Sequence, residues 1–277
     1  MNNRSRQSFL GGRAETEFQK QRIAIIGLCG GGSHIAQQLA HIGFSQFVIC
    51  DYDHVEETNL TRMIGSRPSD ASTAEKKSKV IERLIKKINP DAHVEAVTAR
   101  WQEAAKLLRD CSIIFGCVDK LLARDELERF CRRFLIPYID IGMDVHACED
   151  GFAISGQVAI SLPNCPCLRC MGILRDDALA KEQARYGDAG DRPQVVWPNG
   201  ILASTAVAQF MGLILPWSTS VKPQLLTEYD GNRQQLRESP KLRFFENTQC
   251  CHYETNMELG DPFFSVADLA YGGVPEK

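Results

Sequence analysis

The stretch "DYDHVEETNLTR" brings two aspartate carboxylates, an amide and a guanidinium close together in the chain. The carboxylates are Asp51 and Asp53, the amide is Asn59 and the guanidinium is Arg62. A guanidinium binds phosphate oxygens through paired hydrogen bonds, and a neighbouring amide can orient the same group. Positive side chains are also needed where charge develops at a phosphorus atom. This set therefore suits an enzyme that handles a nucleoside triphosphate, whereas a dinucleotide dehydrogenase has no need of it.

The cysteines "CLRC" have the spacing of a metal site. The chain has eleven cysteines, and a reducing cytosol disfavours structural disulfides. Cys167 and Cys170 are separated by two residues, which lets both thiolates reach one tetrahedral zinc ion. Cys165 could replace one of the other zinc ligands or could take no part in the site.

A second cluster, "CCH", would complete this site from the C-terminal part of the chain. Adjacent ligands are geometrically awkward, so we expect Cys250 and His252 to bind the ion, and Cys251 to be the spare donor. The zinc would be structural, because four protein ligands leave no open position for a substrate. The alternative is a group of free cysteines around a vestigial site.

The segment 22–53 reads as the elements that position the first group. "RIAIIG" is a buried strand, "SHIAQQLAHIG" has the period of a helix that stops at Gly43, and "QFVICDYD" is a second strand. Between the first strand and the helix, Gly27, Gly30, Gly31 and Gly32 form a turn that lets a phosphate approach the helix N-terminus. By itself such a turn is a weak signal.

The rest of the chain alternates strands with helices. We expect helices over 73–90, 101–110, 124–134 and 203–215, and strands over 93–99, 111–119, 137–144 and 154–163. The charged segment 171–196 reads as a long loop, and 224–238 as a hairpin that turns at Asp230-Gly231. The pattern predicts an α/β fold, with a Rossmann-like, mainly parallel sheet, helices on both faces and a C-terminal antiparallel portion.

Composition limits the partners and the compartment. A formal net charge of -3 and a pI of about 6.1 give no reason to expect nucleic acid or a membrane surface as a partner. The first residues lack the apolar run of a signal peptide, and the apolar stretch that ends at Pro216 reads as a buried helix. We therefore expect a cytoplasmic protein.

From Gly27 through "DYDHVEETNLTR" to "KKSKVIERLIKKINP" the sequence resembles the HesA/MoeB/ThiF family, the adenylating core of ubiquitin-activating enzymes. The resemblance implies one adenylation domain over 1–277, with an N-terminal arm (1–20), a nucleotide-binding half (21–150) and a second half with the crossing loop, carrier site and zinc (151–277). It also implies ATP and Mg²⁺ as cofactors.

Each expected site residue is carried over by the resemblance. The residues around ATP would be Gly27, Gly30, Gly32, Asp51, Asp53, Asn59, Arg62, Lys77 and Asp119. Within this set, Asp51 would bind the ribose, Asn59 and Arg62 the phosphates, and Asp119 the magnesium ion. Lys77, with Lys76 as the fallback, would be the phosphate lysine. Arg6 resembles the arginine that reaches into the neighbouring subunit's site, which implies a homodimer.

Three residues depart from the family pattern. Cys29 replaces a glycine, Met63 follows Arg62 where glutamine is usual, and Lys120 follows Asp119 where asparagine is common. None removes a charged group that the chemistry needs. Taken singly, the expected site residues could be ordinary solvated loop side chains, and Asp119 could be a helix cap.

The resemblance implies a reaction in which the C-terminal carboxylate of a small ubiquitin-like or sulfur-carrier protein, ending in glycine, attacks the α-phosphorus of ATP. Because 171–200 contains no cysteine, a thioester would need Cys29 or Cys148, and otherwise the adenylate passes directly to an acceptor. A downstream conjugating partner would fit this scheme. The carrier tail would lie along the loop after Asp140, in the groove under the crossing segment.

Three other interpretations remain open from the sequence. An NAD-dependent oxidoreductase would use the glycine turn and Asp51, but Cys29 breaks the usual glycine spacing and Arg62 and Lys77 would have no role. The chain could also be a non-catalytic scaffold subunit with an adenylation fold. Within the family, the chain could also activate an RNA or a small molecule. The negative net charge disfavours RNA as the substrate.

Overall fold

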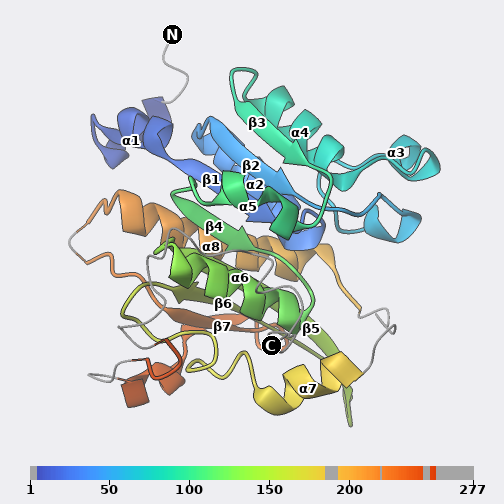
Figure 1. Cartoon of the computed structure of the whole chain (residues 1–277), viewed down its shortest axis with the longest axis vertical. Helices are drawn as coiled ribbons and strands as arrows, with labels where there is room; N and C mark the ends of the chain where they lie inside the picture. The colour runs from blue at the N-terminus through green and yellow to red at the C-terminus, as the bar shows by residue number, and fades with distance from the viewer. Residues whose placement is uncertain (1–4, 185–192, 219, 246–249, 254–277) are drawn as a thin grey trace, which may run out of the picture.

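The computed structural model describes residues 5–184, 193–218, 220–245 and 250–253, which build helices around one eight-stranded sheet (Figure 1). The strands are β1 (Arg22–Ile26), β2 (Gln46–Cys50), β3 (His93–Val97), β4 (Ile113–Gly116), β5 (Tyr138–Cys148), β6 (Gly151–Ser161), β7 (Leu226–Asp230) and β8 (Gln235–Glu238). The helices are α1 (Ala14–Lys20), α2 (Gly30–Ile42), α3 (Pro68–Ser72), α4 (Lys77–Ile88), α5 (Ala105–Leu108), α6 (Leu121–Arg133), α7 (Asp176–Ala184) and α8 (Val196–Ile214). Short 3-10 helices are η1 (Ser5–Leu10), η2 (Glu57–Asn59), η3 (Trp101–Ala104) and η4 (Pro240–Phe245).

The sheet changes character at β5. Its order is β3-β2-β1-β4-β5-β6-β7-β8, and the first five strands in this order pair in parallel. From β5 to β8 every pair is antiparallel. A tight turn joins β5 to β6 and the predicted turn at Asp230-Gly231 joins β7 to β8, whereas α7 and α8 lie between β6 and β7. The predicted mainly parallel sheet with a C-terminal antiparallel portion is confirmed.

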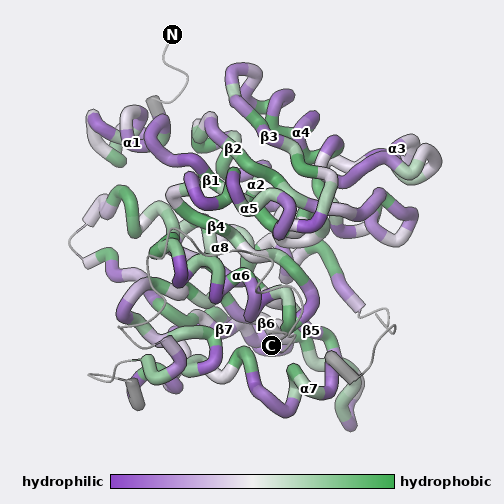
Figure 2. The backbone as a smooth tube through the Cα atoms, in the orientation of Figure 1, coloured by the Kyte–Doolittle hydropathy of each residue, from purple (hydrophilic) through white to green (hydrophobic). Residues whose placement is uncertain are grey.

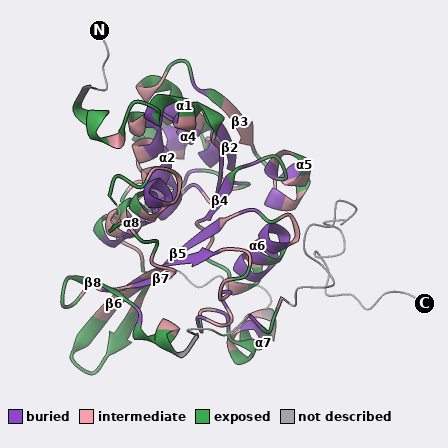
Figure 3. Ribbon diagram, turned by 90° about the vertical axis from the view of Figure 1, so that its left-hand side faces the viewer, coloured by how far each residue is buried: buried purple, intermediate pink, exposed green. Residues whose placement is uncertain are grey.

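Apolar side chains on both faces of the central strands explain why helices cover both sides. In β1, Ile23 and Ile25 point into the core under α2, α4 and α8, whereas Ala24 and Ile26 point into the core under α5 and α6. Such strands carry near-continuous apolar runs rather than an alternation with polar residues. Figure 2 shows this apolar colour along the strands, and Figure 3 shows the buried helix faces on the two sides of the sheet.

The segment expected as a loop over 171–196 contains a helix, α7. Its carboxylate Glu182 accepts hydrogen bonds from the backbone N–H groups of Leu121 and Leu122, at 3.1 and 2.9 Å. A carboxylate is favourable at that position because the first N–H groups of α6 have no partner within their own helix. Contacts with α6 thus hold a helix in a segment whose charged sequence reads as irregular.

The expected loop after Asp140 is also absent, since β5 continues without a break to Cys148. The side chain of Asp140 is fully buried in this strand. The expected loop is therefore wrong, whereas the path of a carrier tail stays a prediction. Among the described residues, no helix is long and apolar enough to cross a membrane.

Candidate functional site

The glycine turn lies where the order of the sheet reverses. The chain proceeds from β1 to β2 on one side, and β4 lies on the other side of β1. In open α/β sheets, ligands bind at this point, outside the carboxyl ends of the strands. Gly27, directly after β1, has a φ of 86°, and a Cβ there would lie 2.4 Å from the carbonyl oxygen of Cys117, directly after β4. Only glycine fits between these two strand ends.

The glycines that open α2 are packed just as closely. A Cβ on Gly32 would lie 1.9 Å from the carbonyl oxygen of Gly27, and one on Gly30 would lie 2.6 Å from the Asn199 side-chain nitrogen. α2 therefore starts immediately at the strand end, with Cys29 as its N-cap residue. This arrangement leaves the first N–H groups of α2 close to the strand ends, as phosphate binding requires.

Asp51 and Asp53 surround the buried end of Lys77. The Lys77 ammonium donates a hydrogen bond to Asp53 Oδ2 at 2.9 Å, and only 7% of the residue is exposed. Burial alone would lower the pKa of Lys77, but the charges of Asp51 and Asp53 outweigh it and the pKa is raised. Lys76 points elsewhere, toward the carbonyl oxygen of Tyr52 at 3.5 Å. Of the two candidates, Lys77 is the one that faces the Asp51 carboxylate.

Asp51 itself holds the glycine turn. Its Oδ2 accepts a hydrogen bond from the Leu28 N–H at 2.7 Å, and its Oδ1 accepts one from the Asp53 N–H at 2.9 Å. Burial raises the pKa of Asp51, while Lys77 and these two backbone donors act in the opposite direction. The carboxylate expected to bind a ribose thus also fixes the start of the turn.

Arg62 is half-buried beside this group, on a turn built by Asn59. The Asn59 side-chain oxygen accepts from the Glu56 N–H at 3.1 Å, and its carbonyl oxygen accepts from the Arg62 N–H at 3.0 Å. Arg62 Nη1 donates to the carbonyl oxygen of Thr58 at 2.7 Å, whereas the buried Nε–H meets no acceptor among the described residues. A buried donor without an acceptor is unfavourable, so this guanidinium fits an anionic ligand.

Asp119 follows β4 on the opposite wall of the switch point. It is exposed, and its Oδ1 accepts a hydrogen bond from Gln194 Nε2 at 3.1 Å. Mg²⁺ is commonly held by one or two carboxylates together with substrate phosphates. A single exposed carboxylate opposite a phosphate-type turn fits that mode of binding.

The Cys29 thiol lies at the centre of these charges. Burial raises its pKa, the charges of Arg62 and Lys77 act to lower it, and those of Asp119 and Asp51 act to raise it. Four expected site residues, from the segment after β2, the start of α4 and the segment after β4, therefore act on one thiol. Arg6 lies outside this group, on the exposed η1, and makes none of the hydrogen bonds described above.

The structure also brings the four expected metal ligands together. The ligand atoms of Cys167, Cys170, Cys250 and His252 all lie within 4.8 Å of one another. Cys170 Sγ lies 3.7 Å from both Cys167 Sγ and Cys250 Sγ, and His252 Nδ1 lies 3.5 Å from Cys167 Sγ and 3.3 Å from Cys170 Sγ. Three thiols and an imidazole at such distances match the donor set of a closed tetrahedral zinc site.

The profile of the ThiF family matches residues 3–252 of the chain. The chain belongs to the ThiF family. The match ends at His252, so it includes the whole cluster of metal-type ligands as well as the glycine turn.

The chain is similar to several named proteins and solved structures. The molybdopterin-synthase adenylyltransferase of Salmonella typhimurium is 26% identical over 228 residues, 80% of this chain and 84% of that protein. The ubiquitin-like modifier-activating enzyme 5 of Dictyostelium discoideum is 24% identical over 164 residues, 54% of this chain and 41% of that protein. The structure of E. coli MccB with ATP shares the fold, with a TM-score of 0.66, 19% identity, and coverage of 86% of this chain and 72% of that one.

In this ThiF-family chain, two residues of α6 that the sequence analysis did not identify, Glu128 and Arg132, bind the segment that carries Cys167 and Cys170. Glu128 Oε1 accepts hydrogen bonds from the Leu168 N–H at 2.9 Å and from the Ser161 hydroxyl at 2.5 Å. Burial raises the pKa of Glu128 to about 7. Arg132 donates to the carbonyl oxygens of Cys165 and Pro166 at 3.0 and 3.1 Å. In the sequence, Glu128 and Arg132 belong to a run of charged residues that is typical of the solvent-exposed face of a helix. Their buried contacts are therefore visible only in the structure.

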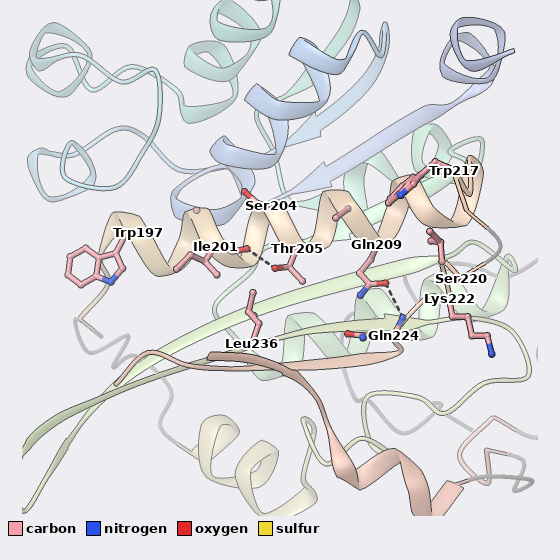
Figure 4. A pocket seen from close by; sticks show the side chains of 13 residues that line it. Trp197, Ile201, Ser204, Thr205, Gln209, Trp217, Ser220, Lys222, Gln224 and Leu236 are labelled. Atoms are coloured by element: carbon pink, nitrogen blue, oxygen red, sulfur yellow. Dashed lines mark hydrogen bonds between the residues drawn. The ribbon is translucent and has the colours of Figure 1, made fainter. Parts of the chain in front are cut away.

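A groove of about 790 Å³ lies along the outer side of α8 (Figure 4). Trp197 and Trp217, at its two ends, are 56% and 45% exposed. The other lining residues are Gly200, Ile201, Ser204, Thr205, Ala208, Gln209, Ser220, Val221, Lys222, Gln224 and Leu236. None of the residues expected around ATP lines it, so the groove is separate from the site at the glycine turn.

Proposed function

We propose that this chain is an ATP-dependent adenylyltransferase that activates the C-terminal carboxylate of a small ubiquitin-like or sulfur-carrier protein. The site at the glycine turn carries this proposal: Asp51 accepts from the Leu28 N–H at 2.7 Å, Asp53 holds the Lys77 ammonium at 2.9 Å, and the charge of Arg62 acts on the adjoining Cys29. The names of the relatives, an adenylyltransferase and a ubiquitin-like modifier-activating enzyme, support it. The single sheet fits one adenylation domain over 1–277.

ATP would bind with its phosphates at Gly27, Gly30 and Gly32 and its ribose at Asp51. Arg62, with its unpaired buried Nε–H, would bind phosphate oxygens, and Asn59 would hold the turn that carries it. Asp53 would hold Lys77.

Mg²⁺ would be bound by Asp119 together with the phosphates. Bound there, the ion would neutralise charge on the departing pyrophosphate.

In the proposed reaction, a carboxylate oxygen of the carrier forms a bond to the α-phosphorus, and the bond from that phosphorus to the bridging oxygen of pyrophosphate breaks. The products are an acyl-adenylate and pyrophosphate. No general base is required because the carboxylate is already ionised at neutral pH. The work of Arg62 and Lys77 is to align the phosphates and to neutralise the charge that develops on them.

We propose that the acyl group then passes directly to a sulfur, thiol or amine acceptor, supplied by the carrier's pathway or by a conjugating partner. Cys29 is a poor candidate for a thioester, since burial raises the pKa of its thiol and the thiolate is the nucleophile. Cys148 is exposed at the end of β5. Zinc would be structural, on Cys167, Cys170, Cys250 and His252.

The test of the adenylation step is ATP–pyrophosphate exchange with purified protein and candidate carriers that end in glycine. Lys77→Met should lower the carrier-dependent exchange about a hundredfold, because one positive group at the developing charge is lost. Lys76→Met is the matched control, since the adjacent lysine points to the Tyr52 carbonyl, and it should exchange at close to the wild-type rate.

Equal losses in the two lysine variants would contradict the assignment of Lys77. If wild type binds ATP tightly but shows no exchange with any carrier, the scaffold interpretation is favoured. Binding of NAD⁺ in preference to ATP would favour the oxidoreductase. Both results would overturn the proposal.

We also propose that the protein acts as a homodimer in which Arg6 serves the neighbouring subunit's site. Arg6→Ala and Arg62→Ala should each be nearly inactive alone. After subunit exchange in an equal mixture, about half of the dimers would be mixed, and each mixed dimer would contain one intact site. The exchange rate should therefore recover to about a quarter of the wild-type rate. A mixture that stays inactive, although light scattering shows mixed dimers, would place Arg6 in its own subunit's site. An Arg6→Ala protein that is active alone would place Arg6 outside any site.

A further inference from the structure

A buried ion pair lies directly behind the switch point. Arg124, on the first turn of α6, donates from Nη1 to Asp140 Oδ2 in β5 at 3.2 Å. The two side chains are only 8% and 0% exposed. Removing two charges from water is costly, and their attraction alone often fails to compensate. The other hydrogen bonds of this guanidinium indicate what the pair does.

On one side, Arg124 fixes the loop that follows β4. Its Nε donates to the carbonyl oxygen of Val118 at 3.0 Å. Val118 immediately precedes Asp119, so the guanidinium holds the peptide from which that carboxylate projects. The charge of Asp119 also acts on the pKa of Arg124, which is consistent with this proximity.

On the other side, Arg124 fixes the strand that supports the glycine turn. Its Nη2 donates to the carbonyl oxygen of Ile141 at 3.4 Å. The Ile141 side chain packs directly on Gly31, where an added Cβ would lie 2.2 Å from Ile141 Cδ1. One guanidinium thus joins both walls of the switch point.

Asp140 holds the guanidinium in this orientation. Its second oxygen, Oδ1, accepts a hydrogen bond from the Tyr138 hydroxyl at 3.0 Å. The Tyr138 ring in turn packs against Gly116, at the end of β4. Both oxygens of Asp140 are therefore bound, and neither the carboxylate nor the arginine can rotate without losing a buried hydrogen bond.

We propose that Arg124, held by Asp140, is a positioning residue that sets the distance between Asp119 and the glycine turn. The inference rests on the proposed function in one respect, the role of Asp119 in binding Mg²⁺ with ATP. Arg124 does not touch the substrate in this proposal. It acts through the Val118 carbonyl on one wall and the Ile141 carbonyl on the other.

The first measurement is hydrogen–deuterium exchange of the full-length protein, comparing Arg124→Lys with Arg132→Lys. Lysine keeps the charge beside Asp140 but lacks the planar fork that reaches Val118 and Ile141 at once. Exchange should accelerate in peptides covering 117–122 and 28–32 for Arg124→Lys only. Arg132 is the matched control, a buried arginine on the same helix that contacts the metal-type loop instead.

Asp140→Asn provides a second variant in case Arg124→Lys does not fold. It keeps the oxygen that accepts from Tyr138 and weakens only the hold on the guanidinium, so it should change the same peptides in the same direction. Unchanged exchange in a folded Arg124→Lys protein, or equal acceleration in Arg132→Lys, would overturn the inference.

The second measurement is the Mg²⁺ dependence of ATP–pyrophosphate exchange. Arg124→Lys should raise the half-saturating Mg²⁺ concentration about tenfold, as losses of groups behind metal ligands commonly do. The maximal rate at saturating Mg²⁺ should recover most of its wild-type value, which general destabilisation would not produce. If wild type shows no exchange at all, the proposed function fails, while the hydrogen–deuterium comparison still decides the role of Arg124.

Discussion

Arg62→Ala should abolish nearly all carrier-dependent ATP–pyrophosphate exchange, with a fall of about 10²–10³-fold. This is the size of loss that follows when one preorganised donor to developing charge is removed. The stability of the folded protein should change little, because truncation removes a buried Nε–H without an acceptor together with the hydrogen bond from Nη1 to the Thr58 carbonyl. The expected result is therefore an enzyme that is dead but stable, measured by exchange kinetics and by thermal unfolding.

Arg67→Ala is the control for this variant. Arg67 lies five positions further along the same segment, is exposed, and is the N-cap residue of α3. Its loss removes the same charge from the protein without reaching the glycine turn, so exchange should stay close to the wild-type rate. A similar fall in both variants would show that the net charge of the segment, and not the position of Arg62, drives the reaction.

Cys250→Ser should release the metal ion and lower the unfolding midpoint by about 10 °C. An ion present at 1,000 times its dissociation constant stabilises the folded state by about 4 kcal/mol. For a domain of this size, each kcal/mol shifts the midpoint by about 2–4 °C. The measurements are metal content by mass spectrometry and thermal unfolding with and without added zinc.

Cys251→Ser is the matched control for the metal site, because it changes the neighbouring thiol of the same cluster. Cys251 is exposed and is not one of the four residues whose ligand atoms converge. It should retain one equivalent of zinc and the wild-type midpoint. If Cys251→Ser loses zinc and Cys250→Ser retains it, Cys251 is the ligand in place of Cys250. If the wild-type protein and both variants all lack zinc, the proposed site is refuted.

The parts of the fold with local signals could be predicted from the sequence. Gly43 ends α2 in the left-handed region with a φ of 113°, as its place after a periodic helix suggests. The turn after Asp230 separates two short strands that pair antiparallel, as expected. The cysteine spacing led to Cys250 and His252 as partners of Cys167 and Cys170, and the structure places those four side chains together.

The parts that depend on long-range contacts could not be predicted. α8 begins at Val196 and not near Ala203 as expected. Pro198 and Gly200 suggested a break in the helix, but proline is tolerated in the first helical turn. Asp140 falls within the strand expected over 137–144, and nothing local shows that an arginine 16 positions earlier, Arg124, will neutralise it inside the sheet. α7 depends in the same way on a cap that Glu182 supplies to another helix.

The metal-type ligands also change the connectivity of the chain as a polymer. Cys170 and Cys250 are 80 positions apart, and α7, α8, β7 and β8 all lie between them. In those unfolded molecules whose thiolates still bind the ion, the ion would also close this stretch into a loop. Closing a loop of that length removes roughly 4.5 kcal/mol of chain entropy from the unfolded state. A chelator would then return that freedom to the whole stretch between Cys170 and Cys250, including segments that touch no ligand.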